Sequence, residues 1–310
     1  MSRLIEGLAC MPLVIGILLF ILGGVGFGAE VGAGDAAHFL RSGVGARAVG
    51  MGGAFVSVAD DVNTAYWNSA GLIQSASVRV GGTYESRYGG LLEFQCVAGS
   101  LFSPTLGGGF MWAHLDMYSM YSVSAAIGLG KFALGVTGKL YNFSVLGQGA
   151  SGVGIDVGSL YRTSLEGVEI ALAVTSDDIG WSKIRWQGYT STDCAAWVTR
   201  LGVGITIQTQ FGSWRAAADW EIALRRPPRQ GESDYFSTAL KNGLNLGTEV
   251  WLGKIAFRAG LSDISITEGE LSVRSTLGLG IRVQGIAFDV AWVPSHQLGS
   301  TYILSTEVQL

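Results

Sequence analysis

Few residues of this chain are of the types, and at the spacings, that enzymes use for catalysis or metal binding. The three histidines, His38, His114 and His296, lie far apart and have no cysteine or carboxylate neighbour at the spacing of a zinc site. Glycine-rich stretches at 43–47 and 50–53 lack the Gly-Lys-Ser or Gly-Lys-Thr ending of a phosphate-binding loop. We therefore expect no catalytic residue, no metal site and no cofactor, and we expect that the protein is not an enzyme.

The adjacent carboxylates of Asp60 and Asp61 are the remaining candidates for chemistry. Two carboxylates that follow an apolar run can bind a cation, or their side chains can accept hydrogen bonds from the backbone and begin a turn. We favour the turn over the cation site. The function of the chain must then depend on the elements that surround these residues.

The composition of the chain is that of a membrane protein. Of its 310 residues 47 are glycine, 5 are proline and 14% are charged, and its mean hydropathy is +0.37, which is too apolar for an ordinary soluble domain. After residue 29, no stretch approaches the roughly 18 consecutive apolar residues that a spanning helix needs. Lipid admits only helices and closed barrels, so the sequence predicts a β-barrel.

The first 29 residues are typical of a signal peptide. Arg3 gives a weakly basic start, and residues 11–28 form an apolar run that ends in small residues. We expect cleavage near Ala29, with a second candidate site after residues 31–33. A retained membrane anchor is the alternative, because the run is nearly long enough to span. Export together with barrel patterning predicts a bacterial outer-membrane location.

Cysteine content and net charge add two further expectations. Cys96 and Cys194 remain after the signal peptide is removed, and a disulfide between them is an open alternative to two small buried apolar side chains. The formal net charge of −4 argues against nucleic acid as a partner.

From about residue 76 onward, apolar and polar residues alternate in segments of about nine to twelve residues separated by turn residues. In residues 273–283, for example, Leu279 and Ile281 share the apolar face while Gly280 and Arg282 lie on the opposite face. Such segments match the length that a tilted strand needs to cross a bilayer. We count about fourteen of them, with twelve as the alternative, and predict an all-β, transmembrane antiparallel barrel.

The same alternation assigns side chains to the lumen, because lipid-facing and lumen-facing residues alternate in a membrane barrel. Eight charged residues are predicted to form the lumen wall, and both signs are present: Arg200, Arg215, Asp219, Glu249, Arg258, Arg274, Arg282 and Asp289. Arg79, Arg162 and Lys254 have the same parity. Mixed charge favours a packed, ion-paired lumen over an open channel of one sign. Two long polar connections, at 177–193 and 225–241, are expected on the extracellular side.

Residues 43–72 carry a recognisable pattern. Gly45-Ala-Arg-Ala-Val-Gly-Met-Gly-Gly-Ala-Phe55 is followed by Ala-Asp-Asp at 59–61 and Tyr-Trp-Asn-Ser-Ala-Gly-Leu at 66–72. This pattern resembles the start of the mature FadL-type outer-membrane transporters and of their PorV/PorQ-like relatives. One position departs from it, since Ser69 stands where the family turn usually has proline.

The resemblance implies that residues 30–75 form an N-terminal hatch that plugs the lumen of a barrel made by residues 76–310. It implies eight ligand or hatch residues: Arg47, Met51, Phe55, Asp60, Asp61, Tyr66, Trp67 and Asn68. Arg47, Asp60 and Asp61 are expected to meet charges of opposite sign on the wall.

Two functions follow from the resemblance, and transport of hydrophobic or amphipathic small molecules is slightly favoured. The alternative is a non-conducting scaffold, like the PorV-type barrels of secretion complexes, that holds a protein partner at its extracellular loops. Outer-membrane lipid is the expected surroundings in both cases. A third possibility, a secreted soluble β-protein, predicts extraction without detergent.

Overall fold

The computed structural model describes residues 37–145, 147–188, 192–224, 240–267, 270–295 and 299–310. The predicted signal peptide, the cleavage sites, His296 and residues 225–239 of the second long connection lie outside these residues.

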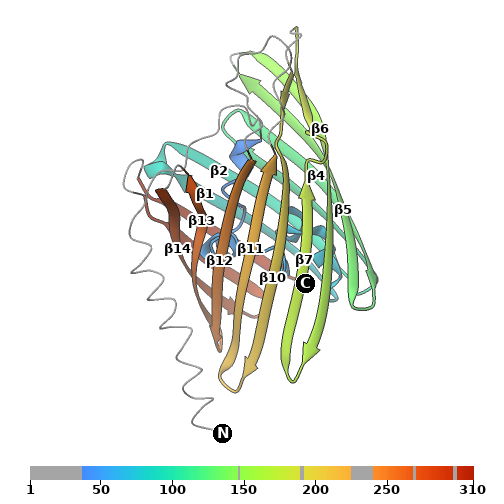
Figure 1. Ribbon diagram of the computed structural model, residues 1–310, viewed down its shortest axis with the longest axis vertical. Coiled ribbons are helices and arrows are strands. Elements are labelled where there is room, and N and C mark those ends of the chain that lie inside the picture. The colour runs from blue at the N-terminus through green and yellow to red at the C-terminus, as the bar shows by residue number, and fades with distance from the viewer. Residues whose placement is uncertain (1–36, 146, 189–191, 225–239, 268–269, 296–298) are drawn as a thin grey trace.

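Fourteen antiparallel strands form a closed ring (Figure 1). The ring consists of β1 (Ser77–Arg87), β2 (Leu92–Phe102), β3 (Leu106–Leu115), β4 (Tyr118–Leu129), β5 (Phe132–Val145), β6 (Gln148–Leu165), β7 (Val168–Asp177), β10 (Trp197–Thr209), β11 (Gly212–Leu224), β12 (Leu240–Leu252), β13 (Ile255–Thr267), β14 (Glu270–Val283), β15 (Ile286–Val293) and β16 (Thr301–Gln309). Pairing of β1 with β16 closes it, from Arg79 opposite Gln309 to Ser86 opposite Tyr302. The predicted fourteen-stranded barrel is confirmed, and the twelve-stranded alternative is wrong.

Two short strands, β8 (Lys183–Trp186) and β9 (Thr192–Cys194), extend the sheet at one end of the ring. The long strand β6 pairs with β7 along residues 157–165 and with β8 along residues 150–152. The long connection at 177–193 therefore continues the barrel wall instead of forming a simple loop.

The strands present apolar side chains outward and small or polar side chains inward. Leu279 and Ile281 of β14 are exposed, whereas Gly280 between them is buried. The apolar outer face is the surface that lipid requires, because lipid-facing and lumen-facing side chains alternate along each strand. Among the described residues, no helix has the length and apolar character to cross a membrane.

The two ends of the barrel differ. Two-residue turns at 130–131, 166–167, 210–211, 253–254 and 284–285 lie at one end, where the amide of Leu310 also bonds to the carbonyl of Val78 at 2.8 Å. The connection at 178–196 lies at the other end. Short turns of such barrels face the periplasm and long loops face outward, so the C-terminus marks the periplasmic end.

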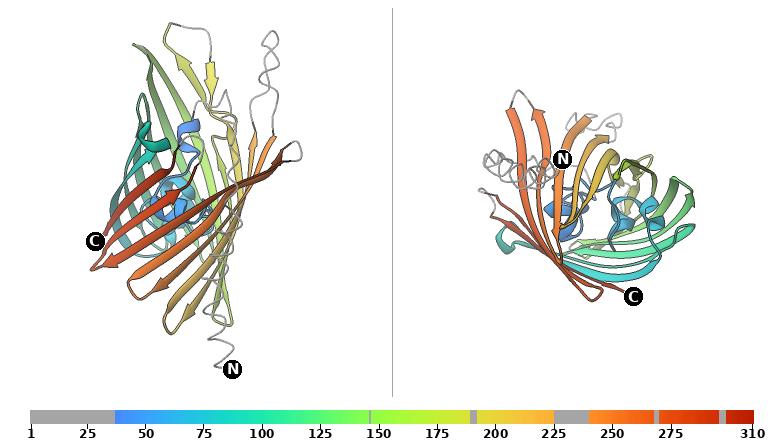
Figure 2. Two further views of the ribbon diagram at one scale, coloured as in Figure 1. Left: turned by 90° about the vertical axis from the view of Figure 1, so that its left-hand side faces the viewer. Right: turned by 90° about the horizontal axis from the view of Figure 1, so that it is seen from below.

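Residues 37–76, called here the inner segment, lie inside the ring (Figure 2). Their helices are short: η1 (His38–Leu40), α2 (Ala46–Gly50), α3 (Thr64–Trp67) and η2 (Ser69–Ile73). A further short helix, η3 (Tyr88–Gly90), lies in the β1–β2 connection. Met51, Phe55 and Trp67 of the inner segment form an apolar cluster with Ala133 and Leu160 of the wall. The hydrophobic core of this protein is therefore in the lumen.

The two cysteines of the described chain are separate. Cys96 on β2 and Cys194 on β9 are both buried, and no disulfide joins them. Cys96 belongs to the apolar cluster inside the barrel, which agrees with the interpretation of a small buried apolar side chain and not with the open alternative of a disulfide.

Candidate functional site

Glycines of the barrel wall let the backbone of the inner segment touch the backbone of the strands. A side chain at Gly247 of β12 or Gly260 of β13 would overlap the backbone at Met51 and Gly52. The position of a Cβ on Gly50 lies 3.0 Å from the Cα of Gly278 on β14. Similar close approaches to the inner segment occur on β1, β3, β5, β6 and β10, at Gly81, Gly107, Gly135, Gly158 and Gly202. The sequence interpretation missed these wall glycines, although they lie on the inward-facing parity of their strands.

A buried carboxylate, Glu249 of β12, joins the inner segment to the wall. It accepts hydrogen bonds from Arg47 at 2.7 and 2.9 Å and from Arg258 at 2.8 Å, and Arg215 lies 3.3 Å away. Burial lowers the pKa of Arg47, but the carboxylates of Asp60 and Glu249 outweigh burial and hold this pKa well above its ordinary value. The Arg47 guanidinium is therefore charged near neutral pH.

Asp60 is a second link between the inner segment and the wall. Its carboxylate lies 2.6 Å from Arg47 and 3.1 Å from Arg215 of β11, and its backbone carbonyl accepts a hydrogen bond from Arg79 of β1. Burial raises the pKa of Asp60, but Arg215 and Arg47 together hold it well below its ordinary value. The expected contact with an opposite wall charge is present for Arg47 and for Asp60.

Asp61 differs from this expectation. It lies 3.8 Å from Arg47 of its own segment and accepts a hydrogen bond from the Asn63 amide at 2.9 Å, which fits the turn interpretation. The nearby wall group is Glu307, of the same sign, which accepts from the Val62 amide at 2.6 Å. Burial raises the pKa of Asp61 to about 7; Arg47 lowers it, whereas Glu307 and Asp60 raise it. The prediction of an opposite wall charge for Asp61 is wrong because Glu307 stands there.

Aromatic and amide side chains hold the end of the inner segment. Trp67 donates to the Val44 carbonyl at 2.9 Å, and Tyr66 donates to the Leu40 carbonyl at 2.5 Å. Asn68 donates to the carbonyls of Val56 at 2.9 Å and Ser159 of β6 at 3.1 Å and accepts from the Ala70 amide. The side chain of Asn68 therefore fixes the turn that proline would otherwise restrict.

Asp219 of β11 binds the middle of the inner segment. Its carboxylate accepts hydrogen bonds from the amides of Phe55 at 2.6 Å and Val56 at 2.9 Å. Phe55 in turn packs edge-on against Trp67, with ring centroids 5.8 Å apart. Met51, like Phe55, is fully buried. All eight predicted hatch residues thus lie in the inner segment, at or near its contacts with the wall.

The remaining predicted wall residues also face the lumen. Arg200 of β10 pairs with Glu221 at 2.9 Å and with Asp177, and Arg274 of β14 pairs with Asp263. Arg258 of β13 pairs with Asp289 of β15 at 2.7 Å. Arg282 of β14 stacks over the Trp251 ring, with its Cζ 4.8 Å from the centroid. A further buried cluster joins Asp156 to Lys139, Asp178 and Tyr141, and the last three were not among the predicted lumen residues.

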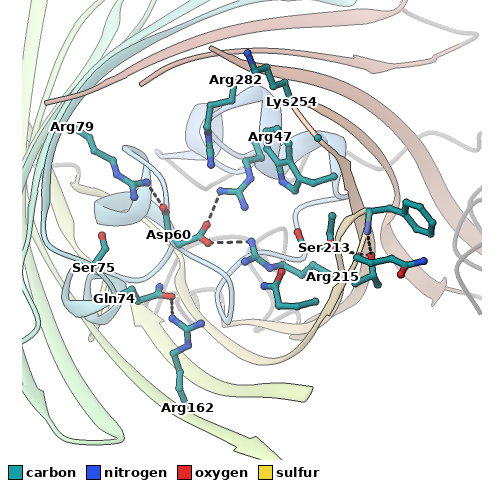
Figure 3. A pocket seen from close by; sticks show the side chains of 17 residues that line it. Arg47, Asp60, Gln74, Ser75, Arg79, Arg162, Ser213, Arg215, Lys254 and Arg282 are labelled. Carbon is teal, nitrogen blue, oxygen red and sulfur yellow. Dashed lines mark hydrogen bonds and ion pairs between the residues drawn. The ribbon is translucent and has the colours of Figure 1, made fainter. Parts of the chain in front are cut away.

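Two hollows lie on opposite sides of the inner segment. The periplasmic one has a volume of about 800 Å³ and is lined by Arg47, Asp60 and Gln74 of the inner segment and by wall residues (Figure 3). The other, of about 60 Å³, is lined by Gly43, Tyr66 and Trp67 together with wall residues that include Arg87 and Glu221. Each hollow therefore has the inner segment as one of its walls.

Comparisons with known proteins show the fold. No protein-family model matches the chain, and no curated protein matches it either. The toluene transporter TbuX of Ralstonia pickettii superposes with a TM-score of 0.51 at 12% identity, over 87% of this chain and 98% of that one. A mutant of the monoaromatic hydrocarbon channel TodX gives 0.46 at 12% identity, over 86% and 97%. CdiB from Acinetobacter baumannii gives 0.46 at 9% identity; the match covers 76% of this chain and 60% of CdiB.

The architecture itself gives the location. An even-numbered, closed antiparallel barrel with an apolar outer face and a polar interior is the outer-membrane design. The protein is therefore a β-barrel of a bacterial outer membrane.

Proposed function

We propose that this barrel is a FadL-type transporter of hydrophobic or amphipathic small molecules and that the inner segment is its hatch. The two hollows on opposite sides of the inner segment carry this proposal. A solute that enters one hollow can reach the other only if the inner segment shifts, because wall glycines bring it into backbone contact with strands around the ring. The hatch would thus act as a gate.

The contacts of the inner segment with the wall are suited to such a shift. They are ion pairs and hydrogen bonds, such as those of Arg47 with Glu249 and of Asp60 with Arg215, and no covalent bond joins the described inner segment to the strands. The fold similarity to the toluene transporter TbuX supports toluene as the first solute to test.

A non-conducting scaffold is the second candidate, and the wall glycines favour it. Their close backbone contacts would equally serve a permanently closed lumen whose outer loops hold a protein partner. Membership of the PorV/PorQ-like branch and a protein partner at the extracellular loops stay predictions.

A disulfide tether distinguishes the two functions. The Ala46 amide donates to the Ser305 hydroxyl at 2.8 Å, so Ala46→Cys with Ser305→Cys, in a background with Cys96→Ala and Cys194→Ala, would fix α2 to β16. We expect cells expressing the oxidised variant to take up radiolabelled toluene more slowly than after reduction. Each single-cysteine variant is the control and should respond to neither treatment.

The outcome against transport is equally clear. Cells without the protein give the background rate of toluene uptake. If the unmodified chain and both the oxidised and the reduced variant give no faster uptake, transport of this solute class is rejected and the scaffold function remains. Equal and rapid uptake by both forms would reject a moving hatch at α2.

A further inference from the structure

The periplasmic hollow is strongly basic. Six of its lining residues are cationic, namely Arg47, Arg79, Arg162, Arg215, Lys254 and Arg282. Asp60 is its one lining carboxylate among the described residues. Nothing in the transport of a neutral hydrophobic solute requires such a concentration of positive charge. We call this hollow the basic vestibule.

Four of the six cations are already neutralised by nearby carboxylates. Arg47 and Arg215 share Asp60 and Glu249. Arg79 lies 3.4 Å from Glu307, and Arg162 lies 3.1 Å from Glu169. Within the described part of the chain, the side chains of Arg282 and Lys254 make neither an ion pair nor a hydrogen bond. The vestibule therefore carries excess positive charge at these two residues.

Arg282 is held in place without using its hydrogen-bond donors. Its guanidinium lies over the ring of Trp251, 4.8 Å from the centroid, and a cation–π contact fixes the planar group while its N–H groups stay free. The Arg282 amide donates to the Lys254 carbonyl at 2.9 Å, and the Arg282 side chain points into the space around Arg47 and Asp60 (Figure 3). A fixed guanidinium with free N–H groups is suited to bind a compact anion.

We propose that the basic vestibule is a binding site for a small molecule that carries a phosphate or a pair of carboxylates. The volume of about 800 Å³ is that of a small-molecule site. The lining turns at 210–212 and 253–254 place its opening at the periplasmic end, so the anion enters from the periplasm. Arg282 and Lys254 supply the free charge, and Ser213 on the rim supplies a hydroxyl donor. The proposal does not depend on whether the lumen conducts.

Calorimetric titration of the full-length protein in uncharged detergent at low ionic strength tests the site, with pyrophosphate as the probe. We expect the Arg282→Gln and Lys254→Gln variants each to bind about tenfold more weakly or worse, since a charged hydrogen-bond partner is lost. The matched control is Lys131→Gln, in the β4–β5 turn at the same end of the barrel. Lys131 is exposed, lies outside the vestibule and donates to Thr163, so its loss should leave affinity unchanged.

A second titration, with dihexanoyl phosphatidic acid below its micelle concentration, identifies the source of the anion. Tighter binding of the lipid than of pyrophosphate indicates a headgroup, and the reverse indicates a soluble anion. If Arg282→Gln fails to assemble, Arg282→Lys keeps the charge and should bind. The proposal is overturned if the unmodified protein binds neither probe, or if Lys131→Gln weakens binding as much as Arg282→Gln does.

Discussion

At the residue scale, the inner segment is joined to the barrel by a few buried charges. Glu249 bonds to Arg47 of the inner segment and to Arg258 of the neighbouring strand, and both arginines are buried. The attraction in such a site is offset by the cost of desolvating the charges, so the pair need not add net stability. Removing one member, however, leaves its partners buried without compensation.

Replacing Glu249 by Gln should therefore be strongly destabilising. We expect the free energy of unfolding to fall by about 3 to 5 kcal/mol, the loss typical of a broken buried ion pair. Unfolding in detergent with increasing denaturant measures it. Glu169→Gln is the matched control, because the side chains of Glu169 and Arg162 are 45% and 35% exposed, and it should cost about 0 to 1 kcal/mol. Equal losses for the two variants would contradict the role assigned to Glu249.

Asp61 predicts a pH dependence. Its pKa in the folded protein is about 7, above the ordinary carboxyl value that holds in the unfolded chain. The folded state thus binds the extra proton between these two values, and the free energy of unfolding falls as pH rises through that window. Asp61→Asn should flatten this fall and be more stable than the unmodified chain at pH 8. An unchanged slope between pH 5 and 8 would reject the protonation of Asp61.

At the scale of the elements, each strand serves two environments. Outward side chains contact lipid, while inward glycines admit the backbone of the inner segment. One strand can do both because successive side chains point to opposite faces. A substitution at an outward position should therefore change contacts with lipid, and a substitution at the next position should change contacts in the lumen.

Leu279 and Leu271 test the lipid-facing side of β14. Both are 55% exposed and share one face, but Leu271 lies next to the end of the strand. Leu279→Arg should destabilise the barrel by about 2 to 4 kcal/mol, whereas Leu271→Arg, nearer the interface, should cost about 0 to 1 kcal/mol. Unfolding titrations in lipid vesicles measure the difference. Equal losses in the free energy of unfolding for the two variants would show that Leu279 is not closer to the bilayer midplane than Leu271.

Gly260 tests the lumen side. Gly260→Val would drive a side chain into the backbone at Met51 and Gly52, so we expect the inner segment to be displaced and to become sensitive to protease. Gly138→Val is the control, since nothing lies within 4 Å of the Cβ position at Gly138 of β5. Protease resistance of the Gly260 variant equal to that of the control would show that the wall contact is dispensable.

At the scale of the whole molecule, the pairing of β1 with β16 and of β5 with β6 closes the strands into a ring, as a membrane-spanning sheet requires. We expect the mature protein in the outer-membrane fraction, and we expect an unboiled sample to migrate faster on gels than a boiled one because a closed barrel resists detergent. Western blotting of fractions checks the location. Recovery in the soluble periplasmic fraction would contradict the membrane assignment.

The barrel could be predicted from local sequence patterns. Alternation with a period of two is a local property of the backbone, so the strands and the inward parity of residues such as Arg215 and Glu249 could be predicted without any long-range information. The glycine-rich pattern of residues 43–72 likewise predicted a segment distinct from the strands.

Which groups contact each other depends on the three-dimensional packing of the chain. Arg47 and Glu249 are 202 positions apart, and their contact depends on how the ring closes and where the inner segment enters it. Asp61 lies near Glu307 instead of a cation for the same reason. The short strand β8 pairs with the part of β6 that extends beyond β7, and β9 pairs with β8. The charges of Arg282 and Lys254 stay free because the carboxylates near the basic vestibule pair with other cations. The parity of a residue along its strand predicts that its side chain faces the lumen, but strand register and packing determine which residue it contacts.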